Sequence, residues 1–200
     1  MQRNAEIAFS VQKNNMTAKL GVVKGFTLIE LVVTMVVAGI LAAVAIPFMS
    51  NFISQTRLSG NVNEFIAATM LARSEAIQRN GAVTICRSSG AETGSNVCDT
   101  GTNDWSSGWL VYVGTSSDTP SAGGPKNLIL ARQGAFTNGT NIAPAPAATS
   151  ITYAANGVPW PAPPASFGFT FNSNFSRIVC FSPSGRTSAL QSGKTAANCP

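Results

Sequence analysis

The chain has 200 residues, and only 10% of them are charged, well below the roughly 25% of an ordinary soluble domain. This composition excludes a coiled coil and a charge-rich disordered chain, whereas 18 Gly and 11 Pro fit a β-rich, loop-rich extracytoplasmic domain. The absence of histidine removes Ser–His–Asp and Cys–His catalytic sites and every His-containing metal site. We therefore expect a protein that is not an enzyme and that uses no cofactor and no metal.

The positive charge is concentrated at the start of the chain. The formal net charge is +5, but four of the 13 basic residues and one of the eight acidic residues lie within residues 1–25. The remainder holds nine basic and seven acidic residues. An argument for nucleic-acid binding must therefore rest on local clusters and not on the global charge.

An apolar segment occupies residues 26–49 and carries one charge, Glu30. A helix of this length spans about 36 Å, enough to cross the hydrocarbon core of a bilayer. Because basic residues flank it only on the N-terminal side, the pattern predicts a single membrane crossing. Residues 1–25 would then be cytoplasmic, and the C-terminal part would lie outside.

Three interpretations of this segment compete. A secretory signal peptide would be cleaved after Ala43-Val44-Ala45, but the apolar run is longer than usual and has an acid near its start. A plain membrane anchor explains the length of the run but not the acid. A carboxylate inside hydrocarbon costs on the order of 2.5–3.5 kcal/mol, so Glu30 needs a reason to be there.

The third interpretation supplies that reason, since Lys24-Gly25-Phe26-Thr27-Leu28-Ile29-Glu30 resembles the processing site of type IV pilins and type II secretion pseudopilins. The resemblance implies that a prepilin peptidase removes residues 1–25 as a leader, cutting between Gly25 and Phe26, and that Phe26 is N-methylated. It implies that Glu30 neutralises the α-amine of Phe26, either its own or that of a neighbouring subunit, and so sets the register of subunits in a filament. It also implies that Gly39 and Pro47, both unfavourable in helices, bracket a stretch that loses helical structure in the filament.

After the apolar segment, residues 50–80 predict the amphipathic half of one helix of about 50 residues. The Asn80-Gly81 pair should end this helix. Ile66, Met70 and Ile77 widen its apolar face. The face itself follows a 4-3-4-3-4 spacing: Leu58, Val62, Phe65, Thr69, Ala72 and Ala76.

Residues 81–200 have the pattern of strands and turns, which we expect to form a periplasmic β-rich domain. Two Pro/Ala-rich segments, 143–148 and 159–165, are predicted loops. The fold class is therefore α+β, a pilin-like lollipop in which a long helix packs on antiparallel β-sheet. Strands are predicted over 82–87, 109–113, 128–132, 150–154, 167–171, 177–182 and 187–190.

Further marks narrow the resemblance to the GspH/FimT branch of minor pilins and pseudopilins. They are Cys86 in the first strand, Cys98 soon after, the Asp-Trp-x-x-Gly-Trp motif of residues 104–109 and a hairpin over residues 178–186. This branch implies a FimU-like minor pilin that takes part in pilus assembly at the bacterial inner membrane. Its expected partners are other pilins, the prepilin peptidase and the inner-membrane assembly platform. The alternative is the minor pseudopilin H of a type II secretion system.

The four cysteines, Cys86, Cys98, Cys180 and Cys199, lie on the side predicted to be periplasmic, where disulfides form. Three pairings are possible. Pairing of sequence neighbours closes loops of 13 and 20 residues, each contributing roughly 3 kcal/mol by loop entropy. Metal ligation is the weaker interpretation, because no spacing resembles C-x-x-C.

A DNA receptor for natural transformation is the alternative of another class, with Arg177, Arg186 and Lys194 as candidate phosphate contacts. Some FimT-like pilins carry a Gly-Arg-x-Arg motif in the last hairpin, but Ser188 replaces the second arginine here. The oxygen-rich residues 98–104 fit a turn better than a calcium loop. Trp160, set among prolines, is either a docking residue or an ordinary loop residue.

Overall fold

The computed structural model describes residues 25–101, 103–121, 123, 127–136, 139–191 and 193–199. The chain forms two compact units, Met1–Ala45 and Ile46–Pro200. Helix α1, Leu28–Arg79, supplies residues to both units and is the single helix of about 50 residues that the sequence predicts. Except for Gly25, the predicted leader lies outside the described residues.

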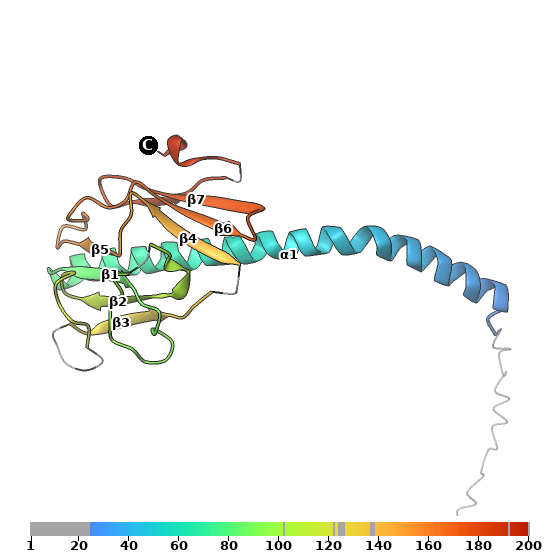
Figure 1. Ribbon diagram of the computed structural model, residues 1–200, viewed down its shortest axis with the longest axis horizontal. Helices are drawn as coiled ribbons and strands as arrows, with labels where there is room; N and C mark the ends of the chain where they lie inside the picture. The colour runs from blue at the N-terminus through green and yellow to red at the C-terminus, as the bar shows by residue number, and fades with distance from the viewer. Residues whose placement is uncertain are drawn as a thin grey trace, which may run out of the picture. The chain divides into compact units, whose positions relative to one another are not determined.

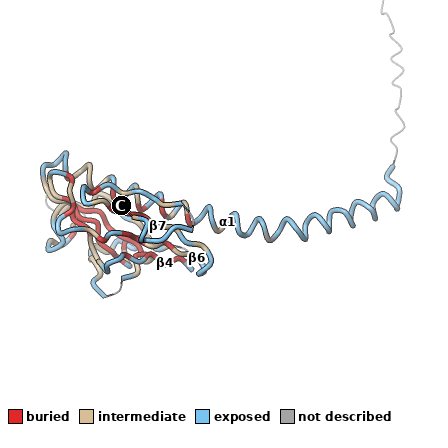
Figure 2. The backbone as a smooth tube through the Cα atoms, turned by 90° about the horizontal axis from the view of Figure 1, so that it is seen from above, coloured by how far each residue is buried: buried red, intermediate tan, exposed pale blue. Residues whose placement is uncertain are grey.

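In the first unit, the described residues are almost entirely the apolar start of α1. This part of the helix is long and apolar enough to cross a membrane, and none of its most apolar window is buried within the protein. Figure 2 shows it as exposed throughout. Exposure of so many apolar side chains costs free energy in water, so this segment requires lipid or other protein around it.

In the second unit, α1 buries the predicted apolar face. Each of the six residues with 4-3-4-3-4 spacing is at most 3% exposed. The predicted widening of this face is wrong at two positions, because Met70 is 60% and Ile77 51% exposed. Both residues lie about 100–120° round the helix from the centre of the buried stripe, where the sheets no longer cover α1.

The end of α1 agrees with the sequence. Asn80 adopts a left-handed conformation with φ of 49°, and the Gly81 N–H donates to the Ala76 carbonyl at 3.1 Å. This bond satisfies one of the carbonyl groups that a helix end leaves unpaired.

Two four-stranded antiparallel sheets make up the rest of the described second unit (Figure 1). Their orders are β3-β2-β1-β5 and β4-β6-β7-β8. The chain is thus α+β, as predicted. The strands of the first sheet are β1 Val83–Arg87, β2 Trp109–Val113, β3 Ile129–Gln133 and β5 Ser150–Tyr153. Those of the second are β4 Thr140–Ala145, β6 Ser166–Phe171, β7 Phe175–Phe181 and β8 Thr187–Ala189.

Strand β4 corrects the sequence analysis, which placed a loop over residues 143–148. Its side chains alternate between buried and exposed, with Ile142 in the core and Asn141 outside. Pro144 is compatible with this strand because β4 pairs only with β6 and forms the edge of its sheet. An edge strand has one side on which a missing N–H breaks no ladder hydrogen bond.

Phe65 of α1 lies at the centre of the core between the two sheets. Its ring centroid is 5.4 Å from that of Trp109 in the first sheet and 4.6 Å from that of Phe167 in the second. Edge-to-face and tilted pairs of this kind add about 0.5–1.5 kcal/mol each beyond the area they bury. Phe65 therefore contacts both sheets from the helix.

Candidate functional site

The start of α1 is built by a reciprocal pair of hydrogen bonds between Thr27 and Glu30. The Glu30 N–H donates to the Thr27 hydroxyl at 3.3 Å, and the Thr27 N–H donates to the Glu30 carboxylate at 3.4 Å. Thr-x-x-Glu at the N-cap and third helical positions is the capping box, which satisfies two otherwise unpaired donors. The Glu30 carboxylate thus points back toward Thr27, the residue next to Phe26.

The predicted cleavage site is accessible. Phe26 is 84% exposed. Among the described residues beyond its chain neighbours, none has an atom within 4 Å of the position that a Cβ on Gly25 would occupy. Gly25, Phe26 and Thr27 precede the helix in non-helical backbone. Farther along, α1 is continuous through Gly39 and Pro47.

The Asp-Trp-x-x-Gly-Trp motif joins the two sheets. Asp104 caps the short 3₁₀ helix η1 (Trp105–Ser107) by accepting from the Ser106 N–H at 2.9 Å, and it also accepts from the Ile142 N–H of β4 at 3.0 Å. Burial alone would raise the pKa of Asp104. The hydrogen bonds from Ile142, Ser106 and Asn141 outweigh burial, and the pKa lies below its usual value of 3.8.

The glycine of the motif makes a close approach of three backbone segments possible. Gly108 has φ of 109°, and a Cβ there would collide with the Gln133 carbonyl and come within 3.1 Å of the Ser88 carbonyl. Trp105 and Trp109 on either side of it are buried in the core. The motif is therefore a structural element of the fold.

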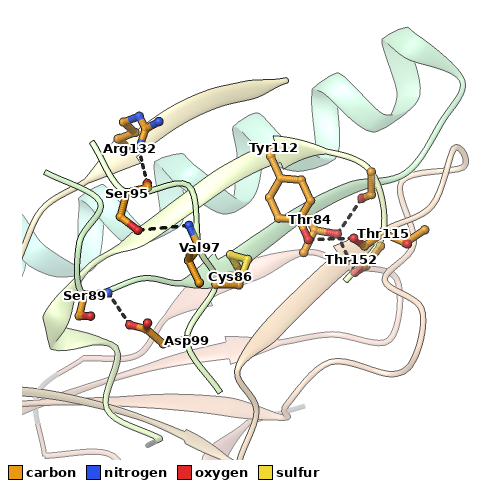
Figure 3. The surroundings of a disulfide bond; sticks show 12 residues. Thr84, Cys86, Ser89, Ser95, Val97, Asp99, Tyr112, Thr115, Arg132 and Thr152 are labelled. Atoms are coloured by element: carbon orange, nitrogen blue, oxygen red, sulfur yellow. Dashed lines mark hydrogen bonds between the residues drawn. A yellow bond between two sulfur atoms is a disulfide. The ribbon is translucent and has the colours of Figure 1, made fainter. Parts of the chain in front are cut away.

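The cysteines form the sequence-near pairs, Cys86–Cys98 and Cys180–Cys199. This settles the choice among the three pairings that the sequence leaves open. The first disulfide closes a loop that polar contacts also hold (Figure 3). Asp99 accepts from the Ser89 N–H, and Arg132 of β3 donates to the Ser95 carbonyl at 2.6 Å. Asp99 thus holds its own loop, whereas Asp104 holds both its turn and strand β4.

The three cations proposed as DNA contacts line three different cavities. Arg177 donates to the Ser59 hydroxyl at 3.5 Å and lines a cavity beside α1. Lys194 lines another, in the C-terminal segment. Arg186 shares a third with Arg73 of α1, a residue that the sequence analysis did not select. No signal along the chain joins these two arginines, because they are far apart in sequence.

Comparison with known proteins identifies the family. The sequence pattern described as "Type II transport protein GspH" matches residues 61–185. The chain belongs to the GspH family. The prokaryotic N-terminal methylation motif matches residues 22–46, which include the predicted cleavage site. This GspH-family chain is therefore a protein of the type IV pilin and pseudopilin superfamily, whose members are structural and associate with other pilins in a filament.

Two crystal structures of the type IV minor pilin FimU of Pseudomonas aeruginosa (strain PAO1) are similar to it. For the crystal form in space group P21, the TM-score is 0.50 at 20% identity, covering 77% of this GspH-family chain and 97% of FimU. For the crystal form in space group P65, the TM-score is 0.48 at 21% identity, covering 73% of this chain and 96% of FimU. The similarity to the crystal form in space group P21 shows that the two proteins share a fold. No match was found among curated proteins.

Proposed function

We propose that this chain is a FimU-like minor type IV pilin, processed between Gly25 and Phe26 and inserted in the bacterial inner membrane with residues 81–200 in the periplasm. Assembly then extracts the apolar half of α1 from lipid into a filament or its tip complex. The observation that carries the proposal is the methylation motif over residues 22–46. Within it, α1 begins with a Thr27–Glu30 capping box, and the most apolar stretch of the helix is exposed. Glu30 would neutralise the new α-amine of Phe26 after cleavage.

The capping geometry supports this role for Glu30. Its carboxylate already accepts from the N–H of Thr27, the residue next to Phe26. Cleavage would create a cation one residue away from a carboxylate held by the helix start. Where the carboxylate pairs with the α-amine of a neighbouring subunit, it would select one axial position of the two subunits, because a charge pair in low dielectric stabilises assembly only when it is well matched.

The mass of the mature chain isolated from the membrane tests the proposal. We expect the first residue to be N-methylated Phe26. A chain that begins at Ile46 would instead indicate ordinary secretion, with cleavage after Ala45. A chain that keeps residues 1–25 in cells that make filaments would contradict processing.

A second candidate is the minor pseudopilin of a type II secretion system, which the family description favours. Both candidates share the same processing and anchoring chemistry. Deletion of the gene that encodes this chain distinguishes the two candidates. Loss of surface filaments supports the pilin, whereas loss of protein secretion with intact filaments supports the pseudopilin.

A further inference from the structure

A small pocket beside the C-terminal part of α1 holds two arginine side chains. Arg73 comes from the helix, and Arg186 comes from the turn between β7 and β8. The pocket has a volume of about 140 Å³. Its lining residues are Thr69, Met70, Arg73, Gly185, Arg186 and Thr187.

Two tight turns hold this pocket against the helix. Gly185 has φ of 79°, and a Cβ there would come within 2.8 Å of the Gly157 carbonyl and 3.1 Å of the Tyr153 ring. A Cβ on Gly157 would in turn lie 3.2 Å from Nε of Arg73. The turns therefore pack on each other and on Arg73, which limits the positions that this guanidinium can take.

Hydroxyl groups lie beside the two arginines. The Thr69 hydroxyl donates to the Ile66 carbonyl at 2.8 Å and lies 3.2 Å from the Thr187 hydroxyl. The Tyr153 hydroxyl is buried beside Thr69 and Arg73. Burial raises the pKa of Tyr153 to about 12, against the opposing effects of nearby Arg73 and Thr69.

Neither arginine has an acidic partner in the described part of the chain. The ion pair found there joins Arg79 to Glu75 at 2.6 Å, on α1 itself. Both guanidinium groups line one pocket, so an anion placed there can pair with both of them. A carboxylate fits because each guanidinium offers it paired N–H donors in one plane.

We propose that this pocket receives the carboxylate of an Asp or Glu side chain from a neighbouring pilin-type subunit. The proposal rests on the proposed function, in which the chain assembles with other pilins. Met70 and Ile77, three residues before and four residues after Arg73, are 60% and 51% exposed. They lie on the same side of α1 as Arg73.

These apolar side chains favour a protein partner over nucleic acid. A phosphate backbone would leave Met70 and Ile77 in water, whereas a protein surface buries them together with the ion pair. Apolar side chains around an arginine are also typical of protein interfaces. In addition, two cations give few phosphate contacts, and affinity for nucleic acid depends on their number.

Photo-crosslinking in the native organism tests the inference. A photoreactive amino acid replaces Met70 in the full chain, and mass spectrometry identifies the crosslinked peptide. We expect a peptide of another pilin-type subunit, with an N-terminal methylation motif in its chain and an Asp or Glu at the contact. Arg186→Ala should lower the yield at least tenfold, and Arg73→Ala should do the same.

Arg79→Ala is the matched control. Arg79 is on the same helix, but it pairs with Glu75 and does not line the pocket. We expect this variant to crosslink like the parent. Since the Arg186 side chain is exposed, Arg186→Ala keeps the test valid even if Arg73→Ala weakens the fold.

Three outcomes would overturn the inference: unchanged yield in Arg186→Ala, a crosslink to nucleic acid, or a contact peptide without an acidic residue. If the chain is not a pilin at all, the result is different, because the chain without any substitution would then be missing from every filament preparation. Normal incorporation with unchanged crosslinking in both arginine variants would reject only the carboxylate pocket.

Discussion

At the scale of single residues, Asp104 connects parts of the chain that are far apart in sequence. One carboxylate caps η1 through Ser106 and accepts from the backbone of β4 at Ile142. Backbone donors held inside a protein cost free energy when they lose their acceptor, so this side chain stabilises more than its own turn. Its role follows from the contacts, which sequence alone does not provide.

We expect Asp104→Ala to lower the free energy of unfolding by about 1–3 kcal/mol at pH 7, because several N–H donors lose a charged acceptor. Since the pKa of Asp104 is lower in the folded state than its ordinary value of 3.8, its stabilisation is complete above pH 3.8. It is lost as the pH falls through the folded-state pKa. Denaturant unfolding of the full chain in detergent, from pH 7 to pH 2.5, measures this.

Asp104→Asn is the control for charge. The asparagine keeps an acceptor for the η1 cap but does not titrate. It should be intermediate in stability at pH 7, and its difference from the parent should shrink below pH 3.8. A difference that stays constant over this range would show that the carboxylate charge contributes nothing.

At the scale of elements, the junction between η1 and β2 depends on Gly108. Its backbone conformation, φ 109° and ψ 176°, is almost restricted to glycine, and the carbonyls of Gln133 and Ser88 leave no room for a side chain. Trp105 and Trp109, on either side of Gly108, are both buried in the core. Their placement requires the backbone between them to lie against these two carbonyls.

Gly108→Ala should therefore cost about 3–4 kcal/mol, the sum of backbone strain and displacement of neighbouring backbone. Gly94→Ala is the matched control, because Gly94 has φ of 89° but nothing within 4 Å of its Cβ position. We expect that variant to lose about 1 kcal/mol from the left-handed conformation alone. Equal losses in thermal unfolding of the two variants would show that the crowding at Gly108 has no effect.

The elements also show what the sequence can and cannot predict. The buried face of α1 follows from the period of the helix, so all six of its residues were predicted. The β4 strand was missed because Pro144 and its alanine neighbours have the composition of a loop, and only the edge position of the strand makes the proline acceptable. Met70 and Ile77 were misplaced because periodicity gives the direction of an apolar face but not the width of the surface that covers it.

At the scale of the whole molecule, the processing motif can be predicted from the sequence, whereas the arginine pocket cannot. The resemblance of residues 24–30 to a processing site can be recognised in the sequence because these residues are consecutive. The capping box, which the sequence analysis did not name, also forms between positions only three apart. Arg73 and Arg186 are brought together by tertiary packing, in which the turn at Gly185 lies against that at Gly157. No local pattern encodes such a meeting.

Glu30 has two possible roles in assembly, and three variants separate them. Glu30→Gln keeps a capping side chain at the third helical position but removes the charge. Thr27→Ala removes the hydroxyl that accepts from the residue-30 N–H but keeps the charge. Glu30→Ala removes the charge together with the acceptor for the Thr27 N–H, and it leaves the Thr27 hydroxyl in place. We expect all three chains to be inserted in the membrane and cleaved after Gly25, because the exposed cleavage site and the apolar helix are unchanged.

Incorporation into filaments should depend on the negative charge of Glu30 and not on the hydrogen bonds that cap the helix. An α-amine without its carboxylate in a lipid-free, apolar filament core is an uncompensated buried charge, which is strongly destabilising, whereas a lost cap costs about 1 kcal/mol. We therefore expect at least a tenfold loss of Glu30→Gln and Glu30→Ala from sheared filaments, with Thr27→Ala close to the parent, measured by immunoblot against the membrane fraction. If Glu30→Gln assembles normally while Thr27→Ala does not, Glu30 acts as a helix cap, and the register of the filament must be set by other contacts.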